Sequence, residues 1–278
     1  MPSVAAVGAA EKIFAANRAT GHIALAVAAR AGRTRRSRVH EDGSLRVRFP
    51  NTASEALEAV IVNTGGGMTG GDRFAVEIAL SEGAGLIAGT AAAEKIYRST
   101  GADAEMNVSL TVGAGARLCW LPQETILFDG ARLKRRIDVD LADNASLLLA
   151  EAVVFGRAAM GETMARGFFA DRWRVRRAGK LVFADGVHLD KAIAEMLATP
   201  ASAAGGIAIA TLLIAPGGDD TLSAVRTLAA QFAGEVGISA WNGIAVARLC
   251  AKDGTSLRHD LILLLTKLDT LVPRLWLN

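Results

Sequence analysis

The sequence predicts a mainly β protein, built as a layered, β-helix-like stack of strands with a few helices in its C-terminal part. The first observation behind this prediction is an internal repeat, in which an alternating stretch, a short turn and a second apolar stretch recur every 30 or 31 residues. The repeat places Ala84, Ala114 and Ala145 at matching positions. Its copies are FAVEIALSEGAGLIAG (Phe74 to Gly89), MNVSLTVGAGARLCWL (Met106 to Leu121) and IDVDLADNASLLLAEAVVF (Ile137 to Phe155).

Strict alternation of apolar residues is the second observation. In the first copy, Val76, Ile78 and Leu80 are apolar at every second position, which indicates a strand with one buried face. A fixed period of this size indicates stacked supersecondary units. The segment WRVRRAGKLVF (Trp173 to Phe183) reads as a weaker fourth copy. A β-sandwich whose hairpins have similar lengths is the alternative architecture.

The C-terminal part departs from this pattern, and we expect a mixed α/β flank there. Its expected elements are a buried strand near Ile207 to Ala215, a helix from Asp219 or Asp220 to Phe232, a hairpin turn at Asn242-Gly243, and a helix from Ser256 to Leu271 that stops before Pro273. No linker separates the flank from the repeats. We therefore expect one domain over residues 1–278, with the β stack at about 20–190 and the flank at about 191–278.

Composition favours a cytoplasmic protein without a membrane span. Apolar residues make up 51% of the chain and the net charge is only +3, so the core is ample and a general attraction to nucleic acid is not implied. Cys119 and Cys250 show neither a disulfide framework nor a zinc spacing. The N-terminal segment contains Glu11 and Lys12 and lacks the apolar core of a secretory signal.

The segment NTGGGMTGGD, residues 63–72, contains the spacing G-x-G-x-x-G. In a dinucleotide-binding fold the third glycine opens a helix whose N-terminus holds the pyrophosphate. Here Asp72 follows the glycines and leads into FAVEIAL, which alternates like a strand. We therefore predict a structural loop with at least two positive φ angles. Its glycines are Gly65, Gly66, Gly67, Gly70 and Gly71.

Four motifs occur in the order and at about the spacing of one known family. They are GGGMTGGDRF (residues 65–74), TAAAEKIYRST (Thr90 to Thr100), WLPQETILFDGA (Trp120 to Ala131) and FGRAAMGETMARG (Phe155 to Gly167). With these motifs the chain resembles the urease accessory protein UreD, called UreH in some organisms, over most of its length. Two positions differ from residues frequent in the family, namely Asn63-Thr64 before the glycines and Cys119 before Trp-Leu-Pro-Gln.

The resemblance implies a scaffold and not an enzyme. Proteins of this family bind a second accessory protein, UreF, which recruits the GTPase UreG, and the assembly docks on apo-urease and supports nickel insertion into the urease active site. The resemblance also implies a β-helical fold and an internal passage for nickel. The alternative function is a dinucleotide-dependent enzyme that uses the Gly65 to Gly70 loop.

Five carboxylates among apolar or glycine neighbours are candidates for the lining of such a passage or for an interface: Asp72, Glu94, Glu124, Glu151 and Glu162. A buried carboxylate is costly unless it is paired or hydrated. Glu151 interrupts the apolar stretch LLLAEAVVF, so we expect either an ion pair, with Arg157 as its candidate partner, or a place in a wet channel. We favour the pair for Glu151 and the passage for Asp72.

Further candidates for the passage or interface are Lys95, Tyr97, Arg98 and Gln123. In a strand, Glu94, Ile96 and Arg98 would share one face and the residues between them the other. A solvated, salt-bridged edge is the alternative interpretation of this charged segment.

A tight metal site, a bound cofactor and a catalytic residue are not expected. Imidazole and thiolate are the usual protein ligands for nickel, and the four histidines (His22, His40, His188 and His259) show no ligand spacing. Nickel binding should therefore be weak, transient and carboxylate-based. The basic segments Arg30 to Arg38, Lys134 to Arg136 and Arg172 to Arg177 fit solvated strand faces or an acidic protein partner better than nucleic acid, because aromatic residues among them are few.

Overall fold

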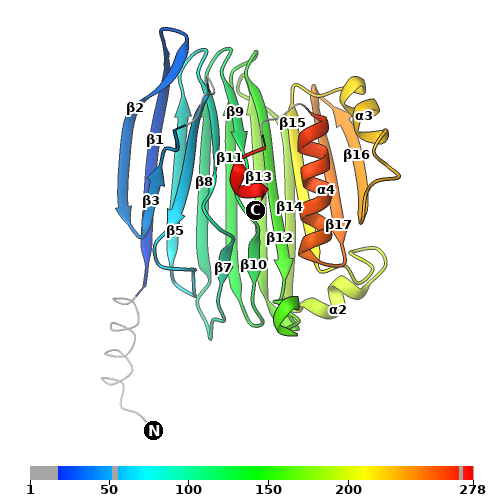
Figure 1. Cartoon of the computed structure of the whole chain (residues 1–278). Coiled ribbons are helices and arrows are strands. Elements are labelled where there is room, and N and C mark those ends of the chain that lie inside the picture. The colour runs from blue at the N-terminus through cyan, green and yellow to red at the C-terminus, as the bar shows by residue number, and fades with distance from the viewer. Residues whose placement is uncertain (1–17, 52–55, 269–271, 278) are drawn as a thin grey trace, which may run out of the picture.

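The computed structural model describes residues 18–51, 56–268 and 272–277. These residues form two large β-sheets packed against each other, with helices on the outer side of one sheet (Figure 1). The N-terminal segment with Glu11 and Lys12 lies outside the described residues, as does the predicted end of the last helix at residues 269–271.

One sheet has seven strands in the order β14-β13-β11-β8-β5-β1-β2. Their bounds are β1 (Thr20–Arg30), β2 (Arg33–Gly43), β5 (Arg73–Leu80), β8 (Ala104–Val112), β11 (Arg132–Leu141), β13 (Arg166–Arg177) and β14 (Lys180–Ala192).

The second sheet has ten strands, of which eight follow the order β16-β17-β15-β12-β9-β6-β4-β3. Two short strands lie off this path, with β10 paired to both β12 and β7. The bounds are β3 (Leu45–Arg48), β4 (Leu57–Asn63), β6 (Gly85–Thr90), β7 (Glu94–Ile96), β9 (Arg117–Trp120), β10 (Thr125–Leu127), β12 (Ser146–Phe155), β15 (Ala208–Ala215), β16 (Glu235–Trp241) and β17 (Ile244–Ala251).

Between β4 and β13 the chain passes back and forth between the two sheets, so each coil adds one strand to each sheet. Neighbouring strands from successive coils run parallel. Parallel neighbours cannot be joined by a tight hairpin, and here the strand in the opposite sheet makes the connection. The structure is therefore the layered, β-helix-like stack that the repeat predicts, and not a sandwich of hairpins.

The turns between the sheets correct one detail of the predicted repeat. Backbone hydrogen bonds join Arg117 N to Ala84 O at 2.8 Å and Ser146 N to Ala116 O at 2.9 Å. The matching residues are thus Ala84, Ala116 and Ala145, all buried, whereas the predicted Ala114 is exposed in a turn. A shift of two residues leaves the in–out alternation of a strand unchanged, so the sequence pattern could not reveal this error.

The predicted fourth copy is a hairpin and not another coil. Strands β13 and β14 pair in antiparallel fashion around Ala178-Gly179, where φ is 47° and 77°. Positive φ at both turn residues suits a two-residue hairpin. The chain therefore stays in the seven-stranded sheet and β14 becomes its last strand.

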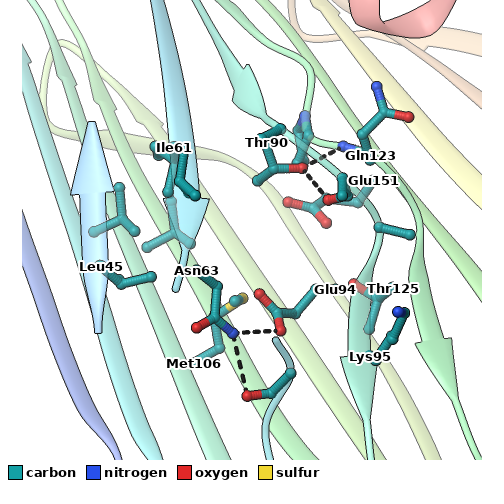
Figure 2. A pocket seen from close by; sticks show the side chains of 18 of the residues that line it. Leu45, Ile61, Asn63, Thr90, Glu94, Lys95, Met106, Gln123, Thr125 and Glu151 are labelled. Atoms are coloured by element: carbon teal, nitrogen blue, oxygen red, sulfur yellow. Dashed lines mark hydrogen bonds between the residues drawn. The ribbon is translucent and has the colours of Figure 1, made fainter. Parts of the chain in front are cut away.

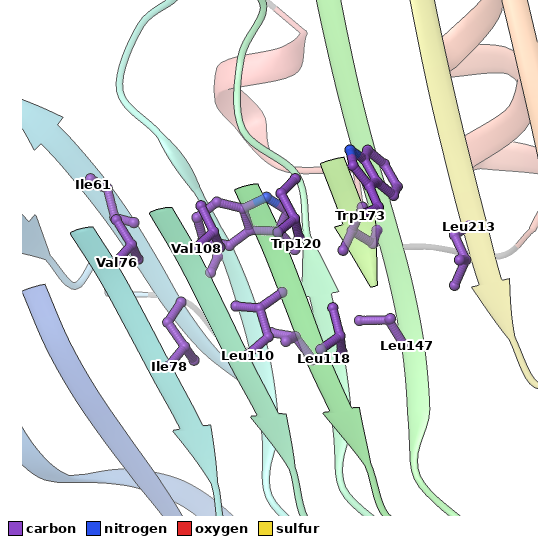
Figure 3. Packing of buried hydrophobic residues seen from close by; sticks show 14 of the residues in the cluster. Ile61, Val76, Ile78, Val108, Leu110, Leu118, Trp120, Leu147, Trp173 and Leu213 are labelled. Atoms are coloured by element: carbon purple, nitrogen blue, oxygen red, sulfur yellow. The ribbon is translucent and has the colours of Figure 1, made fainter. Parts of the chain in front are cut away.

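Apolar side chains fill the space between the sheets. Inward residues of successive coils, such as Val76, Val108 and Leu110 of the seven-stranded sheet and Leu118 and Leu147 of the other, lie side by side (Figure 3). A second apolar cluster lies between the ten-stranded sheet and α4 (Gly254–Lys267). The two clusters explain why both faces of β12 are buried along almost its whole length.

The C-terminal flank contains the predicted strand β15 and a confirmed hairpin between β16 and β17, with Asn242 and Gly243 at positive φ. Helix α3 (Asp219–Arg226) ends well before the predicted Phe232, and Asp260 of α4 accepts backbone hydrogen bonds from the chain just beyond. Helix α4 begins two residues before the predicted Ser256 because the Asp253 carboxylate caps it, accepting from Ser256 N at 2.8 Å. The remaining short helices are α2 (Ile193–Ala198), η1 (Ala158–Met160) and η2 (Arg274–Trp276).

Candidate functional site

The glycine-rich segment forms the loop between β4 and β5. Gly66, Gly67 and Gly71 have φ angles of 74°, 151° and 90°, which confirms the prediction of at least two positive values. The loop enters strand β5 directly. A dinucleotide fold would place a helix N-terminus at this point, so the loop does not have the geometry that the alternative enzymatic function requires.

The loop lies against the next coil of the stack. Met68 N donates to Lys95 O and Tyr97 N donates to Met68 O, both at 2.7 Å. A Cβ atom added to Gly67 would lie 2.7 Å from Lys95 O, and one added to Gly70 would collide with the Ser99 side chain and Ala102 O. The glycines are therefore required by the close approach of two backbone segments.

Asp72 closes this loop through its carboxylate. Its carboxylate is buried and accepts hydrogen bonds from Ala19 N and Thr69 N, both at 2.8 Å. Both carboxylate oxygens thus serve the backbone of the loop and of the segment before β1, and the preference for Asp72 as a passage residue stays a prediction. The contact with Thr69 is local, whereas the contact with Ala19 could not be predicted because Ala19 is distant along the chain.

A cavity of about 160 Å³ lies between the sheets beside the glycine loop. Its lining is mostly apolar, and its polar side chains include Asn63, Glu94, Thr125 and Glu151 (Figure 2). Gly66, Gly67 and the segment of residues 91–95 line the same cavity. The cavity therefore joins three of the four sequence motifs, because Trp120, Pro122 and Thr125 of the third motif also line it. It brings two of the five predicted carboxylates, Glu94 and Glu151, to one space.

Glu94 is the carboxylate in this cavity without a cationic partner. Asn63 Nδ2 donates to Glu94 Oε1 at 2.8 Å and to Gly67 O at 3.2 Å, and none of the ion pairs among the described residues includes Glu94. Burial raises the pKa of Glu94 to about 7, against the lowering influence of Asn63 and Lys95. The carboxyl group therefore exchanges a proton near neutral pH, which is the behaviour expected of a functional group and not of a structural ion pair.

Glu151 belongs to a fully buried ionic cluster. Arg135 donates to Glu151, and through Nε and Nη2 to the two oxygens of Asp171 at 3.0 and 2.6 Å. Trp120 Nε1 donates to Glu151 Oε1 at 2.8 Å, and Trp173 Nε1 donates to Asp171 Oδ2 at 3.0 Å. Although burial alone would lower it, Asp171 and Glu151 raise the pKa of Arg135, so the guanidinium remains charged inside the stack.

This cluster corrects the predicted partner of Glu151. Glu151 is paired, as favoured, but with Arg135 from the opposite sheet. Arg157 instead binds Glu162, with Nε–Oε2 and Nη2–Oε1 distances of 2.7 and 2.8 Å. The expectation of a solvated face for the basic segment Lys134 to Arg136 is wrong for Arg135, which is buried. The sequence holds a signal for this, because Arg135 occupies an inward position of β11 between two fully buried apolar residues, Leu133 and Ile137.

Tyr97 and Arg98 lie on the surface near the glycine loop. Tyr97 is 39% exposed, donates from its hydroxyl to Gly66 O at 3.1 Å and packs edge-on against Phe128. Arg98 pairs with Asp129 at 3.3 Å. Neither residue lines the cavity, whereas Lys95 does. Tyr97 and Arg98 remain candidates for an interface.

Glu124 and Gln123 hold the C-terminal flank on the stack. Arg258 of α4 contacts Glu124 with an Nε–Oε1 distance of 3.0 Å and also donates to Gln123. Gln123 Nε2 donates to Leu275 O at 3.1 Å, and the Arg258 guanidinium lies 5.2 Å from the Trp276 ring. Glu124 is thus engaged in an ion pair that joins two parts of the chain, while Gln123 also lines the cavity.

The described residues offer neither a metal-binding cluster nor a membrane-spanning helix. No group of three or more His, Cys, Asp or Glu residues among them is arranged to hold a metal ion. Within the same residues no helix is long and apolar enough to cross a membrane. Cys119 and Cys250 are free, and burial raises the pKa of Cys119 to about 11.

The fold and the site thus define a β-solenoid protein in which three of the four sequence motifs meet around one cavity between the sheets. The family model described as UreD urease accessory protein matches residues 19–277, and the chain belongs to this family. It is 57% identical over 266 residues to the urease accessory protein UreD of Rhodopseudomonas palustris strain BisA53, covering 96% of this chain and 93% of that protein. It is 56% identical over 266 residues to UreD of Bradyrhizobium diazoefficiens, covering 96% of each.

Proposed function

We propose that this chain is a cytoplasmic, non-enzymatic scaffold that binds UreF and, through it, UreG, docks on apo-urease, and supports nickel insertion by letting the ion pass through the cavity that contains Glu94. Family membership supports the accessory role. The observation that carries the passage is the unpaired Glu94 carboxyl group in an internal cavity of about 160 Å³.

The chemistry of the cavity suits weak, transient binding of a cation that passes through it. Nickel held by several imidazoles or thiolates would be bound tightly, whereas carboxylate and amide oxygens give a weaker site. Glu94 offers such oxygens, whereas Asn63 turns its amide nitrogen toward Glu94 and its amide oxygen accepts from Gly65 N. Glu151, at the same cavity, is already neutralised by Arg135. Conduction requires binding that is favourable enough for entry and weak enough for exit, and one free carboxylate meets this requirement.

The passage is tested with Glu94→Gln, which keeps the size and hydrogen bonding of the side chain but removes the charge. The control is Glu82→Gln, at an exposed position in the turn between β5 and β6. Urease activation is measured in cells at limiting nickel, together with the yield of the accessory complex. We expect several-fold lower activation for Glu94→Gln at normal complex yield, and full activation for the control. Full activation by Glu94→Gln would remove Glu94 from the pathway.

The UreF site is proposed at the end of the stack formed by β14 and β16. Both strands are edges of their sheets, and the Phe183 and Trp241 rings, 6.1 Å apart, connect them. Leu181 and Trp241 are 51% and 41% exposed there. Exposed apolar groups on open strand edges favour association with a partner and, without one, aggregation.

Trp241→Ser tests this site, with Val39→Ser as its control because Val39 is equally exposed, at 41%, on strand β2 at the other end of the stack. Co-purification with UreF should be lost in the first variant and kept in the second, and co-expression with UreF should raise the soluble yield of the unchanged chain. Equal recovery of UreF with both variants would place the UreF site elsewhere.

A further inference from the structure

Strand β2 carries a dense positive charge on an open sheet edge. From Arg30 to His40 the sequence has five arginines and no acidic residue, a local charge of +5 in a chain whose net charge is +3. All five are exposed, and none forms an ion pair with another described residue. We call this set the arginine edge; it consists of Arg30, Arg33, Arg35, Arg36 and Arg38.

Four of these arginines lie on one face. In the register of β1 with β2, Arg33 lies opposite Arg30, while Arg35 and Arg38 lie opposite partly buried alanines of β1. Directly opposed residues share a face. This is the outer face, because Val27, between those alanines in β1, is buried in the core.

The clustering is unfavourable for the isolated chain. Like charges directly opposite each other, as at Arg30 and Arg33, repel. Charged residues on an edge strand do protect against unwanted pairing, and Arg30 lies beyond the part of β1 that pairs with β5, which ends at Val27. An anionic partner from outside the chain would neutralise the whole cluster.

The backbone of β2 adds a second kind of attraction. β2 pairs only with β1 in the described sheet, so one side of its backbone offers N–H and C=O groups that a strand from another protein can bind. On one face of such a strand, side chains recur every two residues, about 7 Å apart. Arg33 and Arg35 follow the same two-residue spacing, and the arginine fork suits bidentate contact with carboxylates.

We propose that the arginine edge is the docking site for an extended acidic segment of a partner protein, which adds to β2 as a strand and sets Asp or Glu side chains against the outer-face arginines. Nucleic acid fits less well. A strand edge pairs its backbone only with another polypeptide, and the aromatic ring at this edge, Phe49, is already covered by Arg36 at 4.6 Å, which leaves that ring closed to base stacking.

The test uses the full chain, co-expressed with UreF for solubility, and fluorescence anisotropy with labelled peptides. The first peptide alternates glutamate with threonine. The second carries lysine in place of glutamate, and the third has the same charge as the first but prolines that prevent strand pairing. A DNA oligonucleotide of equal charge represents nucleic acid. The variant R33Q/R35Q/R38Q removes outer-face charge, and R172Q/R174Q/R176Q removes equal charge from β13 of the same sheet.

We expect the alternating acidic peptide to bind the unchanged protein, and its affinity to fall at least tenfold in R33Q/R35Q/R38Q. The β13 variant should bind this peptide as the unchanged protein does, and both variants should keep its melting temperature. The lysine peptide should not bind, and the proline peptide should bind at least fivefold more weakly than the alternating one. An equal loss of peptide affinity in both variants would overturn the assignment of the site to the arginine edge. Tighter binding of DNA, or equal binding of the proline peptide, would overturn strand addition by an acidic protein. These outcomes do not depend on nickel delivery.

Discussion

The substitution Glu94→Gln should make the protein more stable at alkaline pH and leave its stability nearly unchanged at acid pH. Glutamine mimics the protonated carboxyl group and can accept the same hydrogen bond from Asn63. Burial raises the pKa of Glu94 from 4.5 to about 7. Below pH 4.5 the folded and unfolded chains both carry the proton, so the ionised carboxylate costs nothing.

As the pH rises from 4.5 toward 7, the unfolded chain ionises first and the folded chain loses relative stability. Above pH 7 the full penalty is present. Each pKa unit corresponds to about 1.4 kcal/mol, so the change from 4.5 to about 7 amounts to roughly 3.5 kcal/mol. At alkaline pH the free energy of unfolding of the variant should therefore exceed that of the unchanged chain by about 3.5 kcal/mol.

Equilibrium unfolding in urea, followed by tryptophan fluorescence at low protein concentration, measures this difference. Between about pH 5 and pH 8.5 the difference in the free energy of unfolding between the two proteins should increase by about 2 kcal/mol. The control variant Glu82→Gln, at an exposed turn, should show no such trend. A difference that does not change with pH, or a Glu94→Gln variant that is less stable at pH 8.5, would refute the description of Glu94 as a partly buried carboxyl group without a cationic partner.

Three further predictions concern stability. Glu151→Ala leaves the buried Arg135 with one partner fewer and should lower the free energy of unfolding in urea by about 3–5 kcal/mol. Glu162→Ala, in a more exposed pair, should lower it by under about 1 kcal/mol. Equal losses would contradict the buried cluster. Gly70→Val should lower the melting temperature through collision with the next coil, and Gly101→Ala, where a Cβ has open space, should not. Arg258→Met should speed amide hydrogen exchange in α4 without affecting β5 and β8, and exchange that stays unchanged in α4 would refute the role of this ion pair.

The sequence was sufficient for the β stack because alternation and repetition are local signals. The repeat predicts coils, and the glycine spacing together with the strand pattern after it predicts a structural loop. The hairpin at Asn242-Gly243 follows from turn chemistry alone. Each of these features depends on residues that are close in the sequence.

Pairings between sheets could not be predicted from the sequence in the same way. Arg135 and Glu151 meet across the interior, and a local spacing argument favours Arg157, which in the structure serves its own neighbour Glu162. Arg258 reaches Glu124 from more than a hundred residues away. An inward-facing arginine in an alternating strand indicates that a buried partner exists, but only the stacking order of the coils identifies it.

The regular stacking also makes the molecule a spacer of fixed length. Neighbouring strands lie about 4.8 Å apart, so the seven strands from β2 to β14 set the ends of that sheet roughly 29 Å apart. Both outermost pairs, β1 with β2 and β13 with β14, are antiparallel, so a further parallel coil cannot continue the series and the length does not vary. Removal of one repeat would bring whatever is bound at the two ends about 4.8 Å closer, and proteins that must act on each other across the stack would lose their relative position.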